Sequence, residues 1–86
     1  MNDMSNATLS DLAVMISSDH RAQRKRVYFG AEPYLGAMYS LRSMSDTYGA
    51  DPAPMIVNYL LCNLGSWKGE VAKAVKKELK LRLKGC

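Results

Sequence analysis

Residues 52–64 constrain the fold most, because they form the one window of the sequence that is apolar in nearly every helical direction. Asp51 can accept hydrogen bonds from the free amides of a first helical turn, and Pro52 fits a position that needs no N–H. Gly65 is typical of the residue that follows a helix C-terminus. The Ile-Val-Asn-Tyr segment inside is also β-prone, but about a dozen residues between a proline and a glycine favour a helix. We therefore predict a buried helix here, with the rest of the domain packed around it.

The chain has 86 residues, which is enough for one small domain of marginal stability. It contains no run of about twenty apolar residues for a membrane span, and its first residues lack the pattern of a signal peptide. These features predict a cytoplasmic protein without a membrane span. Cys62 is expected in the core helix and Cys86 at the chain end, so both are predicted to be free thiols. The sequence has no set of cysteines and histidines for zinc, and we expect neither a metal nor another cofactor.

Two amphipathic helices are predicted before the central one, over residues 8–18 and 33–48. Thr8 and Asp11 match a capping box, and apolar residues then recur at the i, i+3, i+4 and i+7 positions of a helix. A proline suits the first turn of the second helix, which we expect to end at Gly49. Tyrosines and methionines recur at helical spacing between these points, so we expect them in the core.

A fourth helix is predicted over residues 67–84, with Ser66 as its cap. Its inward side is expected to contain Trp67, Val71, Ala72, Val75, Leu79 and Leu83. Its outward side has lysines at i, i+4, i+7 and i+11, namely Lys73, Lys77, Lys80 and Lys84. Residues 1–7 show no periodicity and are predicted to be a flexible N-terminus. The predicted fold class is therefore all-α, a single domain over residues 8–84 with four principal helices and a basic C-terminal helix.

Residues 19–29 join the first two predicted helices and are expected to be partly helical. Asp19 can cap a segment that reaches Arg26, either as part of one bent helix or as a separate piece. His20 is the only histidine in the sequence, and no serine or cysteine nucleophile stands at a diagnostic spacing from it. We interpret His20 as an exposed structural histidine, and we predict that the protein is not an enzyme.

Basic residues gather in two parts of the sequence. The chain has twelve lysines and arginines and a net charge of +4, with four basic residues within 21–26 and seven within 68–84. Tyr28 and Phe29 follow the first cluster, either as core anchors or as rings on which bases stack beside phosphate contacts. The clusters indicate contact with nucleic acid or an acidic protein face, and solvated helix faces are the simpler alternative. The predicted binding residues are Arg21, Arg24, Lys25, Arg26, Tyr28, Lys73, Lys77 and Lys80.

Five short motifs give the sequence a resemblance to known proteins. They are Tyr28-Phe29-Gly30-Ala31, Pro33-Tyr34, Tyr48-Gly49, Ser66-Trp67-Lys68-Gly69-Glu70 and Lys76-Lys77-Glu78-Leu79-Lys80. In this order, over residues 19–80, they resemble a group of small proteins from bacteriophage and prophage genomes. The resemblance implies an accessory phage protein, a class that includes inhibitors of host defence, such as anti-CRISPR proteins, and small regulators of transcription. It implies no particular activity and no functional residue.

The function predicted from these features is binding without catalysis. The first hypothesis is a phage-type accessory protein, in the host cytoplasm, that binds a host protein or ribonucleoprotein complex through its basic helical surface. It would act by occlusion, as an anti-CRISPR-like inhibitor does. The alternative is a nucleic-acid-binding protein or small transcriptional regulator that contacts DNA or RNA phosphates through lysines and arginines. A marginal core also predicts a homodimer through residues 33–64, with Tyr39, Met44, Met55 or Tyr59 exposed in the monomer.

Overall fold

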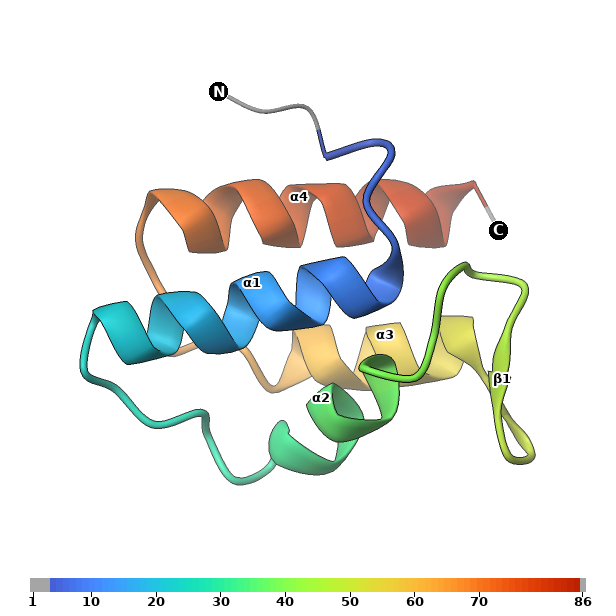
Figure 1. Cartoon of the computed structure of the whole chain (residues 1–86), viewed down its shortest axis with the longest axis horizontal. Helices are drawn as coiled ribbons and strands as arrows, with labels where there is room; N and C mark the ends of the chain where they lie inside the picture. The colour runs from blue at the N-terminus through green and yellow to red at the C-terminus, as the bar shows by residue number, and fades with distance from the viewer. Residues whose placement is uncertain (1–3, 86) are drawn as a thin grey trace.

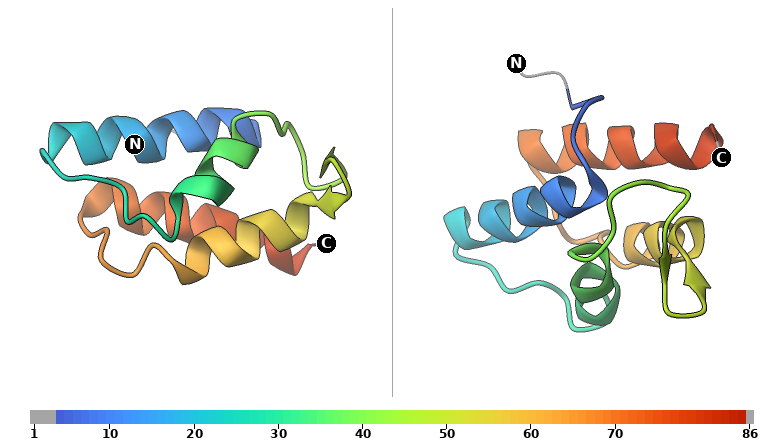
Figure 2. Two further views of the ribbon diagram at one scale, coloured as in Figure 1. Left: turned by 90° about the horizontal axis from the view of Figure 1, so that it is seen from below. Right: turned by 45° about the vertical axis from the view of Figure 1, so that its right-hand side comes forward.

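Helices make up most of the regular structure in the computed structural model, which describes residues 4–85 (Figure 1). In chain order the elements are α1 (Leu9–Ala22), α2 (Glu32–Met38), β1 (Thr47–Tyr48), β2 (Asp51–Pro52), α3 (Ala53–Cys62) and α4 (Glu70–Lys84). α1 and α4 lie side by side and run in opposite directions (Figure 1). α2 packs against α1 and α3, and α3 packs against α4, so the four helices surround a shared core (Figure 2). The prediction of a mainly helical domain is confirmed, whereas the short hairpin was not predicted.

α1 begins at the capping box that the sequence predicted. Thr8 Oγ1 accepts a hydrogen bond from the Asp11 amide at 2.9 Å, and an Asp11 carboxylate oxygen accepts one from the Thr8 amide at 3.0 Å. The helix continues past residue 18 to Ala22, because Ser17 points its hydroxyl back to carbonyls of the preceding turn and does not interrupt the backbone. Arg24 then takes a left-handed conformation, with φ of 57°, and the chain leaves the helix. Residues 19–22 are thus one continuous extension of α1.

The helix predicted over residues 33–48 ends ten residues early, at Met38. The backbone beyond Met38 forms hydrogen bonds with α1 in place of helical ones. The carbonyls of Leu41 and Arg42 accept hydrogen bonds from the free amides at the start of α1, at 2.8 and 2.9 Å. An Asp46 carboxylate oxygen accepts hydrogen bonds from the amides of Arg42 and Ser43 at 2.8 and 3.2 Å, which closes a turn. A continuous helix would prevent both sets of contacts.

The hairpin occupies the place where a helix end was predicted. Thr47 pairs with Pro52 and Tyr48 with Asp51 in antiparallel register. Gly49 has φ of 62° and lies in the two-residue turn, so the left-handed conformation expected of this glycine serves a hairpin and not a helix terminus. Asp51 therefore belongs to β2 and does not cap α3, and Pro52 is the N-cap residue, with no side-chain hydrogen bond.

α3 is shorter than predicted and is not buried on every side. Ile56, Val57 and Leu60 face the core, whereas Tyr59 and Cys62 are exposed. Cys62 is a free thiol as predicted, but its predicted burial is wrong, because α3 lies at the edge of the bundle with one face open to solvent. Cys86 lies outside the described residues.

α4 begins at Glu70 and not at residue 67. Gly69, with φ of 116°, is its N-cap residue, and the predicted cap at Ser66 is wrong. Trp67 is buried as predicted, but in the loop before the helix. Val71, predicted to face inward, is 37% exposed, because the later start of α4 leaves it in the first turn at the edge of the bundle.

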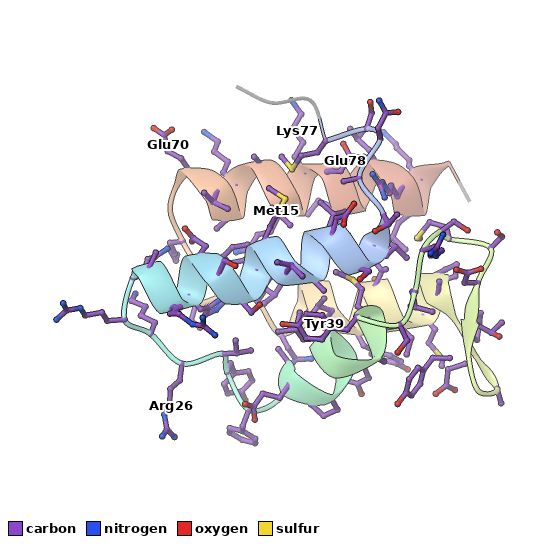
Figure 3. All side chains as sticks on the ribbon, viewed as in Figure 1. Met15, Arg26, Tyr39, Glu70, Lys77 and Glu78 are labelled. Carbon is purple, nitrogen blue, oxygen red and sulfur yellow. The ribbon has the colours of Figure 1, made fainter. Side chains whose placement is uncertain are left out.

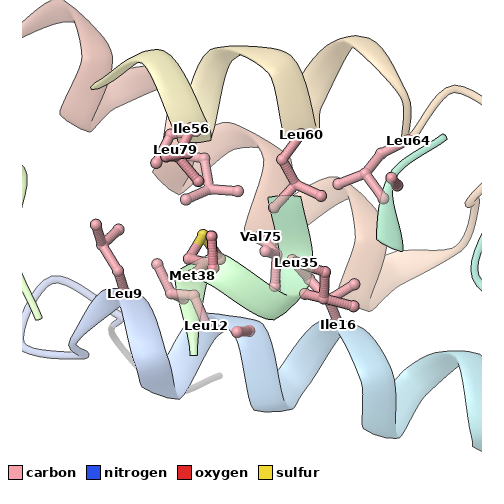
Figure 4. Packing of buried hydrophobic residues seen from close by; sticks show 14 of the residues in the cluster. Leu9, Leu12, Ile16, Leu35, Met38, Ile56, Leu60, Leu64, Val75 and Leu79 are labelled. Atoms are coloured by element: carbon pink, nitrogen blue, oxygen red, sulfur yellow. The ribbon is translucent and has the colours of Figure 1, made fainter. Parts of the chain in front are cut away.

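The core lies between the four helices (Figure 4). Its largest fully buried side chains are Trp67, Leu9, Leu12, Ile16, Met38, Leu41, Leu60, Leu64, Leu79, Val57 and Val75. Met4 and Ala7 pack against this core, so the ordered chain begins before Thr8. The Arg82 guanidinium donates a hydrogen bond to the Met4 carbonyl at 2.8 Å and ties this segment to α4. Residues 1–3 of the predicted flexible N-terminus lie outside the described part of the chain.

Candidate functional site

The outer side of α4 carries a row of exposed lysines. Lys77 points away from α1 (Figure 3), and Leu81, which is 54% exposed, lies among the lysines. We define the α4 lysine face as Lys73, Lys77, Lys80, Lys84 and Leu81. With Lys76 and Leu83, these residues line an open hollow of about 760 Å³. The face therefore combines positive charge with an apolar contact.

The charges of this face are not neutralised within residues 4–85. The one ion pair in this part of the chain joins Arg82 Nε to a Glu78 carboxylate oxygen at 2.8 Å. Glu78 is thus engaged by Arg82, which also holds the N-terminal segment. The four lysines consequently keep their positive charge free for a partner.

Lys76 has a structural role that separates it from the other lysines. Its Nζ donates a hydrogen bond to the Trp67 carbonyl at 2.6 Å and lies 5.8 Å from the centre of the Trp67 ring. Burial lowers the pKa of Lys76, and the charges of Lys68 and Lys80 lower it further. This ammonium therefore fixes the loop before α4.

Trp67 also fastens this loop to the end of α1. The Trp67 Nε1–H donates to an Asp19 carboxylate oxygen at 2.8 Å, and the same oxygen accepts from Gln23 Nε2 at 2.6 Å. Gln23 Nε2 also donates to the Lys68 carbonyl at 2.9 Å. Two regions that are distant in the sequence, around Gln23 and around Lys68, therefore lie in direct contact.

His20 is buried against Trp67, so its predicted exposure is wrong. The two rings are stacked with centroids 5.1 Å apart, and only 5% of His20 is exposed. His20 Nδ1 lies 2.7 Å from the Ile16 carbonyl oxygen, which can only accept, so Nδ1 carries the proton. The interpretation as a structural histidine fits this position, and the burial was missed because Trp67 is far away in the sequence.

The predicted binding residues fall on two surfaces. Arg26 lies on the loop after α1, at the edge of the molecule opposite Lys77 (Figure 3). Arg21 is exposed in the last turn of α1, and Arg24 and Lys25 are exposed directly after Gln23, which contacts the loop before α4. The second surface, which we name the basic–aromatic loop, comprises Arg24, Lys25, Arg26, Tyr28 and Phe29.

The aromatic residues of this loop are not core anchors. Tyr28 is 47% exposed and Phe29 is 75% exposed, and their ring centroids are 4.8 Å apart at an angle of 54°. A Cβ atom on Gly30 would lie 2.6 Å from Tyr28 Cε2 and 2.8 Å from Asn63 Oδ1. The Tyr28 ring thus lies close over Gly30, and the lack of a side chain at this glycine, a role that was not predicted, leaves room for the ring. The Phe-Gly pair was the local signal for this close approach.

A third exposed region lies on α2 and α3. The rings of Tyr34 and Tyr59 stack with centroids 5.3 Å apart, and Tyr59 is 45% exposed. Tyr39, which is 42% exposed, donates its hydroxyl hydrogen to Ser17 Oγ at 2.6 Å (Figure 3). The predicted exposure of these two tyrosines is confirmed, and dimerisation through them stays a prediction.

No protein-family model matches the chain, and no curated protein or solved structure is significantly similar to it. Within residues 4–85, no three His, Cys, Asp or Glu side chains come together as a metal-binding group. Among the helices of that same part, none has both the length and the apolar character needed to cross a membrane. The charge and shape of the three exposed regions are therefore the features of the molecule that bear on its function.

Proposed function

We propose that this chain is a non-enzymatic accessory protein of the phage type, which binds an acidic surface of a host protein or ribonucleoprotein complex through the α4 lysine face. The observation that supports this proposal is the set of four unpaired lysines placed around the exposed Leu81. Binding acts by occlusion, because a bound domain of this size covers the acidic surface that the host factor uses.

The arrangement of this face suits a protein surface. Lysines at the rim of an interface attract acidic partners over about 8 Å at physiological salt and mainly raise the association rate. An apolar side chain at the centre contributes through burial, which requires an apolar patch on the partner. Leu81 supplies such a centre, and a phosphate backbone offers nothing for it to pack against.

Hydrogen bonds at both ends of α4 support the same proposal. Lys76 fixes the loop at its N-terminal end, and Arg82 binds both Glu78 and the Met4 carbonyl near its C-terminal end. The lysine side chains therefore project from a helix held at both ends, so binding orders few backbone groups.

The test is capture of host proteins by the tagged chain, with two triple variants that change the charge equally. Lys73→Glu/Lys77→Glu/Lys80→Glu should abolish retention of a specific partner that the wild type holds at low salt and releases at high salt. The matched control, Arg24→Glu/Lys25→Glu/Arg26→Glu, should retain that partner from nuclease-treated lysate, because these residues lie outside the α4 lysine face. Circular dichroism must show that both variants are folded. Equal loss in both variants, or retention by the first, would contradict the proposal.

A further inference from the structure

Phe29 is the most exposed large hydrophobic residue in the part of the chain that the structure describes, with 75% of its surface in contact with solvent. It is the only phenylalanine in the sequence. Its one ring neighbour among the described residues is Tyr28, in a tilted contact that leaves the rest of the Phe29 ring open. A small domain with a marginal core gains from burying such a ring, so its placement outside the core indicates a use at the surface.

The aromatic pair is held in place before any ligand arrives. The Tyr28 ring packs over Gly30, where an added methyl group would collide with both this ring and the Asn63 side-chain oxygen. Asn63 is itself fixed, because its side-chain amide donates to the Tyr59 carbonyl at 2.8 Å. The amide of Ala31 donates to the Tyr28 carbonyl at 2.8 Å and closes the turn that contains Phe29. A preorganised ring loses little conformational entropy when it stacks on a ligand.

Three cationic side chains precede this pair in the sequence. Arg24, Lys25 and Arg26 are all exposed, and none forms an ion pair within residues 4–85. The amides of Arg24 and Lys25 are tied to carbonyls of the last turn of α1 at 3.0 and 2.8 Å, so the start of the segment is anchored. The loop thus carries three exposed cationic side chains within five residues of two exposed rings.

We infer that the basic–aromatic loop binds single-stranded nucleic acid, with Phe29 as the platform for a stacked base and Arg24, Lys25 and Arg26 as phosphate contacts. Every nucleobase has a flat aromatic face, so stacking of this kind is tolerant of sequence. In a duplex those faces are covered by neighbouring base pairs, and an aromatic side chain on a protruding loop cannot reach them without unstacking a step. The site is separate from the α4 lysine face and does not depend on it.

The test is fluorescence anisotropy with a labelled twelve-residue oligothymidylate. Phe29→Leu keeps an apolar side chain but removes the aromatic face, and it should weaken binding about tenfold, the size expected for one lost base-stacking contact. Tyr48→Leu is the control, because Tyr48 is another exposed ring, 48% exposed, on the hairpin and outside the loop, and its replacement should leave the affinity unchanged. An abasic oligomer of the same length should bind wild type about as weakly as Phe29→Leu binds oligothymidylate.

Salt dependence separates the phosphate contacts from stacking. Arg24→Gln/Lys25→Gln/Arg26→Gln should flatten the slope of log affinity against log salt by about 2, since each phosphate contact to a single strand contributes about 0.7. Lys73→Gln/Lys77→Gln/Lys80→Gln should leave that slope unchanged. The experiment therefore tests nucleic-acid binding by the loop separately from protein binding by the α4 lysine face. Equal affinity of Phe29→Leu and wild type for the oligonucleotide, or equal affinity of wild type for a duplex, would each overturn the inference.

Discussion

The side chain of Trp67 connects the loop before α4 to α1 through both its N–H group and its ring. Its Nε1–H donates to Asp19, its ring stacks on His20, and the ammonium of Lys76 lies over the same ring. The burial of a tryptophan is favourable only when its N–H finds a partner, and here a carboxylate on α1 supplies it. The Trp67 side chain, together with the hydrogen bonds of Lys76 and Gln23 to the backbone of this loop, therefore holds the start of α4 against α1.

Trp67→Phe should lower the free energy of unfolding by about 1–3 kcal/mol, because it removes the hydrogen bond to Asp19 and leaves a small cavity. Urea unfolding followed by far-ultraviolet circular dichroism measures the change. Tyr48→Phe is a suitable control, since Tyr48 is half exposed and its loss of a hydroxyl should cost almost nothing. A change below about 0.5 kcal/mol in Trp67→Phe would show that the bond to Asp19 contributes little.

At the scale of elements, features that depend on neighbouring residues could be predicted from the sequence, whereas features that depend on contacts between distant residues could not. The capping box of Thr8 and Asp11 involves neighbours in sequence, and it is present as predicted. The end of α2 at Met38 was missed, because it is decided by amides of α1 that need carbonyls from residues 41 and 42. The exposure of Phe29 was left open for a similar reason, since no periodicity tells whether a ring in a loop faces the core.

The turn after α2 provides a test that depends on pH. Hydrogen bonds from the amides of Arg42 and Ser43 lower the pKa of Asp46 below its usual value of 3.8, and the charge of Arg42 lowers it slightly more. A carboxyl with a lower pKa in the folded state stabilises the fold when ionised, and this stabilisation is lost as pH falls through the folded pKa. Asp46→Asn should therefore be less stable than wild type at pH 7, and the difference should shrink below pH 3.8 in urea unfolding. Asp51→Asn serves as the control. If the difference in stability between Asp46→Asn and wild type did not change with pH, it would not come from ionisation of Asp46.

For the whole molecule, the exposed lysines of α4 and the exposed tyrosines of α2 and α3 lie on different elements. The α4 lysine face is at one edge, and the stacked pair of Tyr34 and Tyr59 lies on α2 and α3. Two copies that met through their lysine faces would repel one another, although salt screens this repulsion beyond about 8 Å. Contact through α2 and α3 avoids that repulsion and covers exposed tyrosine rings, so this is the side through which the chain is expected to pair.

We predict that the protein forms a homodimer through the tyrosines of α2 and α3. A few hundred Å² of apolar surface, at about 25 cal/mol per Å², outweighs the screened repulsion between the remaining charges. Light scattering across a hundredfold range of concentration should show the mass rising from monomer toward dimer. Tyr59→Glu, which places a charge on the stacked pair, should keep the chain monomeric, whereas Tyr48→Glu on the hairpin should not. A constant monomer mass for wild type would contradict the dimer, and pairing of Tyr59→Glu as strong as that of wild type would place the interface elsewhere.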